Sequence, residues 1–159
     1  MVLYGRCERF SLSKAICQPT LRNIMAKVTF ILGLCGSGKT YLAEQLKNET
    51  GAEIFENLLS DGSRLPALVE CLRDGKDCVV DEVRFCLPAY RNEIVQHLSR
   101  IIGLKMRCIC YENDLESANW NVIHRKNKGD PEGHLEMNLR LHSEYEYPRD
   151  AEIIPIQRI

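Results

Sequence analysis

The sequence predicts a three-layer α/β/α fold built on a five-stranded parallel sheet. Two observations favour this fold class. Short apolar runs alternate along the chain with longer segments of helical periodicity, which is typical of strand–helix–strand units. The run at residues 27–32 is almost continuously apolar, as expected of a strand buried on both faces of a parallel sheet. Right-handed crossovers bring the carboxyl ends of such strands to one edge, where α/β proteins bind ligands.

The first strand, at residues 27–32, is followed by a helix expected at 39–49. Three apolar residues of this helix recur at helical spacing, namely Leu42, Ala43 and Leu46. They define the face that packs against the sheet. A glycine shortly after the segment ends the helix.

The second and third strands are expected at residues 52–55 and 77–81, and both are short. Residues 57–63 hold Asp61 and Gly62 and are expected to form a loop. A helix is expected at 65–73, between the two strands, and Gly75 closes it.

The next helix, at residues 88–101, has a proline near its first turn, where proline is well tolerated. The fourth strand follows at 104–111. A helix at 114–125 comes next, capped by Asp114 or Asn113.

The last part of the chain begins with a polar segment, residues 126–133, which is predicted to be a mobile loop because of its Gly and Pro content. A helix follows at 134–145, and Pro148 stops it. The fifth strand is expected at 152–157.

A glycine-rich segment joins the first strand to the first helix and matches the Walker A, or P-loop, pattern in full: Gly33, Leu34, Cys35, Gly36, Ser37, Gly38, Lys39 and Thr40. The glycines let the backbone turn its N–H groups inward, and the helix N-terminus adds further donors for phosphate. Lys39 is expected to reach the β- and γ-phosphates, and the Thr40 hydroxyl to bind Mg²⁺. The segment therefore predicts binding of ATP with Mg²⁺.

Three polar residues follow neighbouring strands and are candidates for chemistry. Asp81 ends the third strand and would hold Mg²⁺, or else cap a turn. Asp61 follows the second strand and would face the phosphate acceptor as a base, although Asp61 and Gly62 also make a good turn. Arg84 would bind the acceptor, or would be an ordinary solvated arginine.

Arg125, Lys126 and Lys128 form a basic cluster at the start of a predicted lid near residues 125–133. A cationic lid suits phosphoryl transfer, because negative charge spreads over the transferred group and water must be excluded. Arg125 is the first candidate both for nucleotide binding and for stabilising the transition state. The alternative is a solvated, charged loop.

The composition bounds the remaining possibilities. The chain has 159 residues and a net charge of −1, which gives no indication of a nucleic-acid partner. No apolar run is long enough for a membrane helix. The chain has eight cysteines but no Cys-x-x-Cys pair, so a zinc ribbon is not supported. Free cysteines favour a reducing, cytoplasmic location. The four histidines show no metal-binding spacing.

Two segments are expected within the chain. Residues 25–159 form a single domain by the usual size prior. Residues 1–24 carry four basic residues against one acidic residue. They are interpreted as a poorly ordered extension or an over-called start, with a transit peptide as the alternative.

The chain resembles the small P-loop kinases, in the group that includes polynucleotide kinase and zeta-toxin-like ATPases. The resemblance covers about residues 26–157. It is carried by the P-loop, by the sequence from Val79 to Asp81, by the basic segment from His124 and by the Tyr-Glu-Tyr-Pro ending at Pro148. The resemblance implies the nucleotide-kinase-like fold of P-loop nucleoside triphosphate hydrolases. It also implies ATP·Mg²⁺ as donor and the roles given above to Lys39, Thr40, Asp61 and Arg125.

The chain departs from this group at two places. Its lid holds one clear arginine followed by lysines, and the loop after the second strand holds one aspartate without an Asp-x-Asp pair. The leading hypothesis is an ATP-dependent kinase acting on a hydroxyl of a small molecule or nucleotide-like acceptor. The alternatives are an ATP-binding switch or scaffold with slow hydrolysis, and a kinase of nucleic-acid 5′-hydroxyl ends. The acceptor and the oligomeric state stay open.

Overall fold

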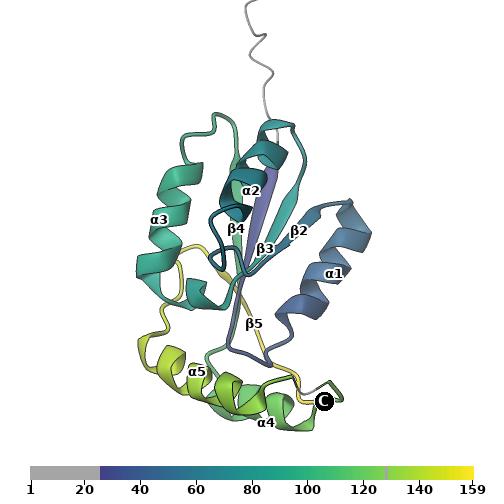
Figure 1. The fold of residues 1–159 in the computed structure, drawn as a ribbon, viewed down its shortest axis with the longest axis vertical. Helices are drawn as coiled ribbons and strands as arrows, with labels where there is room; N and C mark the ends of the chain where they lie inside the picture. Colours follow the sequence, from purple (N-terminus) through teal and green to yellow (C-terminus); the bar gives the residue numbers. More distant parts are fainter. Residues whose placement is uncertain (1–25, 128) are drawn as a thin grey trace, which may run out of the picture.

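The computed structural model describes residues 26–127 and 129–159 (Figure 1). The extension expected at 1–24 and the lid residue Lys128 lie outside the described residues. Five parallel strands form one sheet in the order β2-β3-β1-β4-β5. They are β1 (Lys27–Leu32), β2 (Glu53–Glu56), β3 (Cys78–Asp81), β4 (Lys105–Tyr111) and β5 (Glu152–Ile154). The predicted fold class is confirmed.

Helices cover both faces of this sheet. They are α1 (Lys39–Thr50), α2 (Arg64–Arg73), α3 (Pro88–Leu98), α4 (Leu115–His124) and α5 (Pro131–Glu144), with a short 3₁₀ helix η1 (Val83–Cys86). One core lies between the sheet and α2 and α3, where Phe30 of β1 meets Leu68 and Leu98. The other core lies on the opposite face, where Ile31 packs with Ala43 of α1 and Leu141 of α5. Consecutive strand residues thus serve opposite cores, as the period of a strand requires.

Most element boundaries lie within one residue of the sequence prediction, and three places differ by three residues. The strand expected at 152–157 ends at Ile154, because Pro155 has no N–H to continue the ladder. The helix expected at 88–101 ends at Leu98. The loop expected at 126–133 is wrong at its end, since Pro131 already begins α5 and the Asp130 carboxylate caps it.

The carboxyl ends of the strands meet at one edge of the sheet, which is the lower edge in Figure 1. The P-loop follows β1 at this edge, and α4 and α5 lie together below it. The fold therefore gathers the ends of β1, β2 and β3 opposite this helix pair. Within the described part of the chain, no helix is long and apolar enough to span a membrane.

Candidate active site

The P-loop adopts a conformation that depends on glycine. Gly36 and Gly38 have φ angles of 86° and 107°, in the left-handed region that L side chains rarely enter. A Cβ atom at Gly36 would also lie 2.4 Å from the carbonyl oxygen of Ala118. Gly38 is the N-cap of α1; among the described residues no side chain caps this helix, and its first turn holds no acidic residue. The amino end of α1 is thus open to an anion.

Lys39, Thr40 and Asp81 meet at this helix end. The Lys39 Nζ donates to the Leu34 carbonyl at 3.1 Å and lies 4.0 Å from Asp81 Oδ1. The Thr40 hydroxyl donates to Asp81 Oδ2 at 3.0 Å. The Lys39 and Asp81 side chains are only 9% and 10% exposed, so their charges act in a poorly hydrated place.

These groups fit a magnesium ion that also binds phosphates. A hydroxyl and a carboxylate are oxygen ligands, and Mg²⁺ commonly takes only one or two protein ligands beside phosphates and waters. The described residues contain no group of three or more histidine, cysteine or acidic side chains that could hold a metal by themselves. The buried Ser37 hydroxyl has no hydrogen-bond partner among the described residues. It lines the same cavity as the lysine.

That cavity has a volume of about 1300 Å³. Its lining combines the P-loop with the ends of several elements: Glu56, Asn57, Asp81, Val83, Tyr111, Asn121, Arg125 and His134 are among its residues. Arg125 follows the last turn of α4, and its Nη2 lies 2.8 Å from His134 Nδ1 on α5. The structure therefore brings Arg125 to the cavity that holds Lys39.

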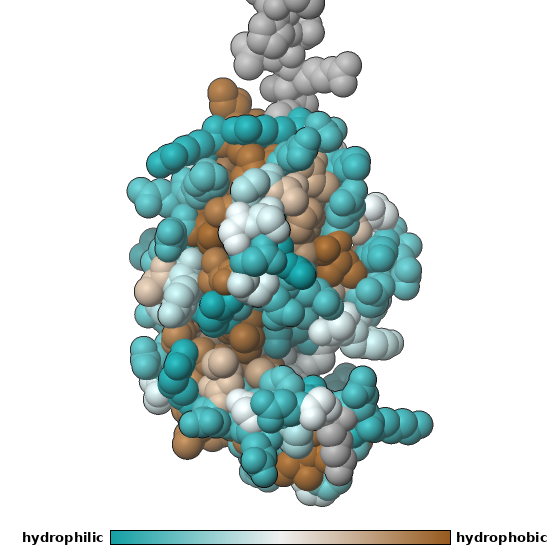
Figure 2. Space-filling model, viewed as in Figure 1, coloured by the Kyte–Doolittle hydropathy of each residue, from teal (hydrophilic) through white to brown (hydrophobic). Residues whose placement is uncertain are grey.

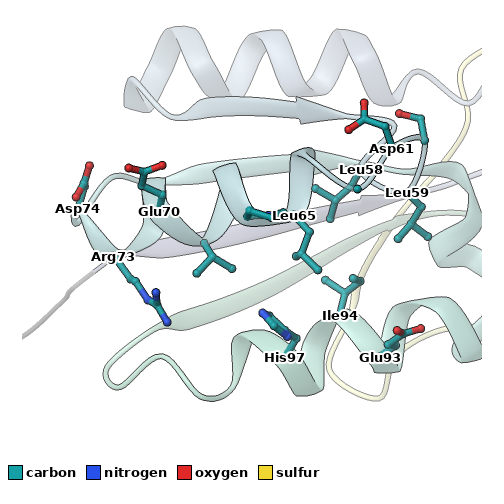
Figure 3. Close-up of a pocket in the computed structure, with 14 residues that line it drawn as sticks. Leu58, Leu59, Asp61, Leu65, Glu70, Arg73, Asp74, Glu93, Ile94 and His97 are labelled. Atoms are coloured by element: carbon teal, nitrogen blue, oxygen red, sulfur yellow. The ribbon is translucent and has the colours of Figure 1, made fainter.

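Asp61 lies in a different place. It lines a groove of about 1030 Å³ between α2 and α3, and does not line the P-loop cavity. Figure 3 shows Asp61 near Leu58 at one end of this groove, with Asp74 at the other end. Hydrogen bonds from Ser63 lower the pKa of Asp61, and its carboxylate also pairs with Arg64 at 3.4 Å. The structure does not unite Asp61 with the phosphate site.

Arg84 is also held away from the P-loop cavity. Its Nε donates to Glu82 Oε1 at 3.0 Å and its Nη2 to Glu82 Oε2 at 3.2 Å. This two-pronged ion pair joins a fully buried carboxylate to η1. The guanidinium is thus engaged by the protein itself.

Two residues that the sequence prediction missed line the cavity beside the P-loop. Glu56 ends β2 and Asn57 follows it, and both line the cavity. Asn57 has a φ of 49°, and its N–H donates to the Asp81 carbonyl at 2.9 Å. The sequence feature that could have identified them is their position directly after the strand expected at 52–55, at the same edge of the sheet as the P-loop.

Cys35 contributes a half-buried thiol to the cavity. Burial raises the pKa of Cys35, and this outweighs the opposite effect of Lys39 and Arg125. The thiol therefore stays protonated at neutral pH and is a poor nucleophile. All six cysteines in the described ranges are free thiols.

Comparison with known proteins finds similar chains only among solved structures. No protein-family model matches the sequence, and no curated protein matches it. A gluconokinase from Sinorhizobium meliloti 1021 is 16% identical with a TM-score of 0.59, covering 87% of this chain and 86% of its own. A fungal RNA kinase is 14% identical with a TM-score of 0.60, covering 85% of this chain and 78% of its own.

A sugar kinase from Janibacter sp. HTCC2649 is similar to the same extent. It is 14% identical with a TM-score of 0.58, and the match covers 84% of this chain and 87% of that one. At such low sequence identity, the similarity shows a shared backbone fold. Together with the P-loop and its open helix end, it establishes that this chain has the fold of the small P-loop kinases.

Proposed function

We propose that the protein is an ATP-dependent phosphotransferase that moves the γ-phosphate of ATP to a hydroxyl of a small molecule. One observation carries this proposal. Lys39, Thr40 and Asp81 converge at the open amino end of α1, inside a cavity that also receives Arg125. The cavity leaves room beside the phosphate site for a second substrate.

Each residue has a role that its position supports. The P-loop amides and Lys39 would bind the phosphates, and Thr40 with Asp81 would hold Mg²⁺. When bound, Mg²⁺ neutralises charge on the phosphate oxygens. Arg125 would stabilise the charge that develops on the transferred group.

We assign to Glu56 the role of the carboxylate that orients the acceptor hydroxyl and takes its proton. Glu56 lines the P-loop cavity, whereas Asp61 lines the groove between α2 and α3. A general base must come within hydrogen-bond reach of the proton that it removes. Asp61, which the sequence suggested for this role, and Arg84 as an acceptor ligand remain predictions.

The experiment that tests the proposal is ADP formation from ATP·Mg²⁺ with a panel of acceptors. Sugars, sugar acids, nucleosides and 5′-hydroxyl oligonucleotides form its arms. We expect one small-molecule class to raise the rate, and Lys39→Ala to lower that rate by at least about 10²-fold, because a cation that stabilises the transition state is lost. Near-normal turnover in Lys39→Ala would contradict the mechanism.

The same panel separates the alternatives. One of the similar structures is described as an RNA kinase, and stimulation by oligonucleotides alone would move the acceptor to nucleic acid. ADP formation that no acceptor raises would favour an ATP-binding switch or scaffold with slow hydrolysis.

Matched carboxylate-to-amide variants decide between Glu56 and Asp61. We expect Glu56→Gln to lower acceptor-dependent turnover by about 10²–10⁴-fold, as for loss of a general base. Asp61→Asn should stay near the wild-type rate. Nucleotide affinity should be similar in both variants. The reverse order of the two rates would return the role to Asp61.

A further inference from the structure

A buried asparagine of α5 binds the middle of the P-loop. Asn138 is fully buried, and its Oδ1 accepts from the Cys35 N–H at 2.6 Å. Its Nδ2 donates to the Cys35 carbonyl at 2.9 Å and to Asn119 Oδ1 of α4 at 2.9 Å. One side-chain amide thus pairs with both backbone groups of a single P-loop residue.

A second asparagine, on α4, binds the next residue of the loop. Asn121 is 5% exposed, and its Nδ2 donates to the Gly36 carbonyl at 2.9 Å and to the Gln157 carbonyl at 2.8 Å. Its Oδ1 accepts from the Ile159 N–H at 3.0 Å. Asn121 therefore ties the P-loop to the segment after β5.

These contacts matter because they hold Cys35 and Gly36 in the middle of the loop, whereas Tyr111 and Asp81 bind its end at Gly38 and Thr40. Gly36 and Gly38 have access to many backbone conformations, and ordering them costs conformational entropy. The orientation of the peptides at Cys35 and Gly36 decides where the following N–H groups point. A loop that is already ordered binds phosphate without meeting that cost at the moment of binding.

We infer that Asn138, assisted by Asn121, is a positioning residue that holds the P-loop in its phosphate-binding shape. The inference rests on the proposed nucleotide binding. Asn138 does not line the cavity that would receive the phosphates; it acts through Cys35. The helix pair that supplies both asparagines also flanks Arg125, whose guanidinium meets His134 of α5. Loop shape and arginine position are thereby set by the same two helices.

The test measures binding of inorganic triphosphate with Mg²⁺ by calorimetry. This probe has no base or acceptor, so it reports on the P-loop alone. Asn138→Asp keeps the acceptor oxygen but loses both donated hydrogen bonds and adds negative charge. We expect it to bind triphosphate at least about tenfold more weakly, the effect of about two lost hydrogen bonds.

Asn113→Ala is the control for the loss of a side-chain amide that does not bind the P-loop. Asn113 lies between β4 and α4, and its side-chain amide binds α5. Its Nδ2 donates to the His142 carbonyl at 3.0 Å, and its Oδ1 lies 2.9 Å from His142 Nδ1. Within residues 26–127 and 129–159, its hydrogen bonds go to Tyr147 and His142 and none goes to the P-loop, so its loss should lower thermal stability but leave triphosphate affinity unchanged. The amide resonances of Gly36 and Gly38 should shift in Asn138→Asp and stay in place in Asn113→Ala.

Each outcome decides the inference. Wild-type affinity in folded Asn138→Asp, or an equal loss in Asn113→Ala, would overturn it. If Asn138→Asp does not fold, Asn121→Ala takes its place, with an expected loss of about threefold for one contact to the loop; unchanged affinity would again overturn the inference. If the wild-type protein fails to bind triphosphate, the proposed nucleotide site itself is wrong, and the positioning role falls with it.

Discussion

Glu82 is a buried, charged residue with a structural role. It is 1% exposed, and its carboxylate accepts from the Leu59 N–H at 3.0 Å and from the Arg84 N–H at 3.1 Å, besides the guanidinium. Burial alone would raise the pKa of Glu82, but the hydrogen bonds from Arg84 and Leu59 outweigh it, so the pKa lies below its usual value. The carboxylate thus links the loop after β2 to the end of β3.

This arrangement predicts a structural effect for Arg84→Ala. Removing the guanidinium leaves a buried carboxylate with fewer donors, and we expect unfolding to become easier by about 2 kcal/mol at pH 7. Because the folded pKa is depressed, the stabilisation is present above the ordinary glutamate value and is lost as the pH falls through the folded pKa. Urea unfolding at several pH values measures this difference.

Arg84→Lys serves as the control, since it keeps a charge but loses the two-pronged geometry. It should fall between the wild type and Arg84→Ala in stability. Unchanged stability in Arg84→Ala, combined with weaker binding of the acceptor, would support the acceptor role that the sequence first suggested.

Among the helices, α4 begins at an N-cap, Asp114, and ends just before Arg125. The Asp114 carboxylate accepts from the Ser117 N–H at 3.0 Å. We expect Asp114→Ala to destabilise the protein by about 1 kcal/mol at neutral pH, as for loss of an N-cap. Thermal unfolding of the two proteins under the same buffer conditions measures the difference.

The pH dependence of this cap has a definite sign. Hydrogen bonds from Ser117 lower the pKa of Asp114 below its usual value. The advantage of wild type over Asp114→Ala is therefore full above the ordinary aspartate pKa and shrinks as the pH falls through the folded pKa. Asp114→Asn, which caps without titrating, should keep its advantage in acid. An equal loss for Asp114→Asn would contradict the cap.

How far the sequence predicts each element depends on how local its signals are. The P-loop was predicted in full, because strand, glycines and helix are adjacent in the chain. The start of α5 was missed because Asp130, Pro131 and Gly133 suit a loop as well as a helix start. Asn138 could not be found, since it lies 103 residues from Cys35 and no local pattern links the two. The Glu56 position depends on where β2 ends, which the sheet decides.

Over the whole molecule, the two faces of the sheet differ in what they offer. The face covered by α2 and α3 presents the groove with Asp61, and Figure 2 shows apolar side chains among hydrophilic ones on this side. The cavity with Lys39 opens at the carboxyl edge, between α1 and the pair of α4 and α5. Contacts to the P-loop come from β3, β4, α4 and α5. A ligand at the P-loop therefore acts on elements that are spread over residues 78–144 of the chain.

This connectivity predicts that ATP·Mg²⁺ stabilises the folded protein as one unit. A ligand that binds only the folded state at a hundredfold excess over its Kd contributes about 2.7 kcal/mol. For a domain of this size, that corresponds to a rise in Tm of roughly 5–10 °C. Lys39→Ala should lose most of this rise, because its phosphate affinity falls, whereas Glu56→Gln should keep it, since Glu56 is assigned to the acceptor. Differential scanning calorimetry with and without ATP·Mg²⁺ measures the effect, and an equal rise in Lys39→Ala would show that the nucleotide binds elsewhere.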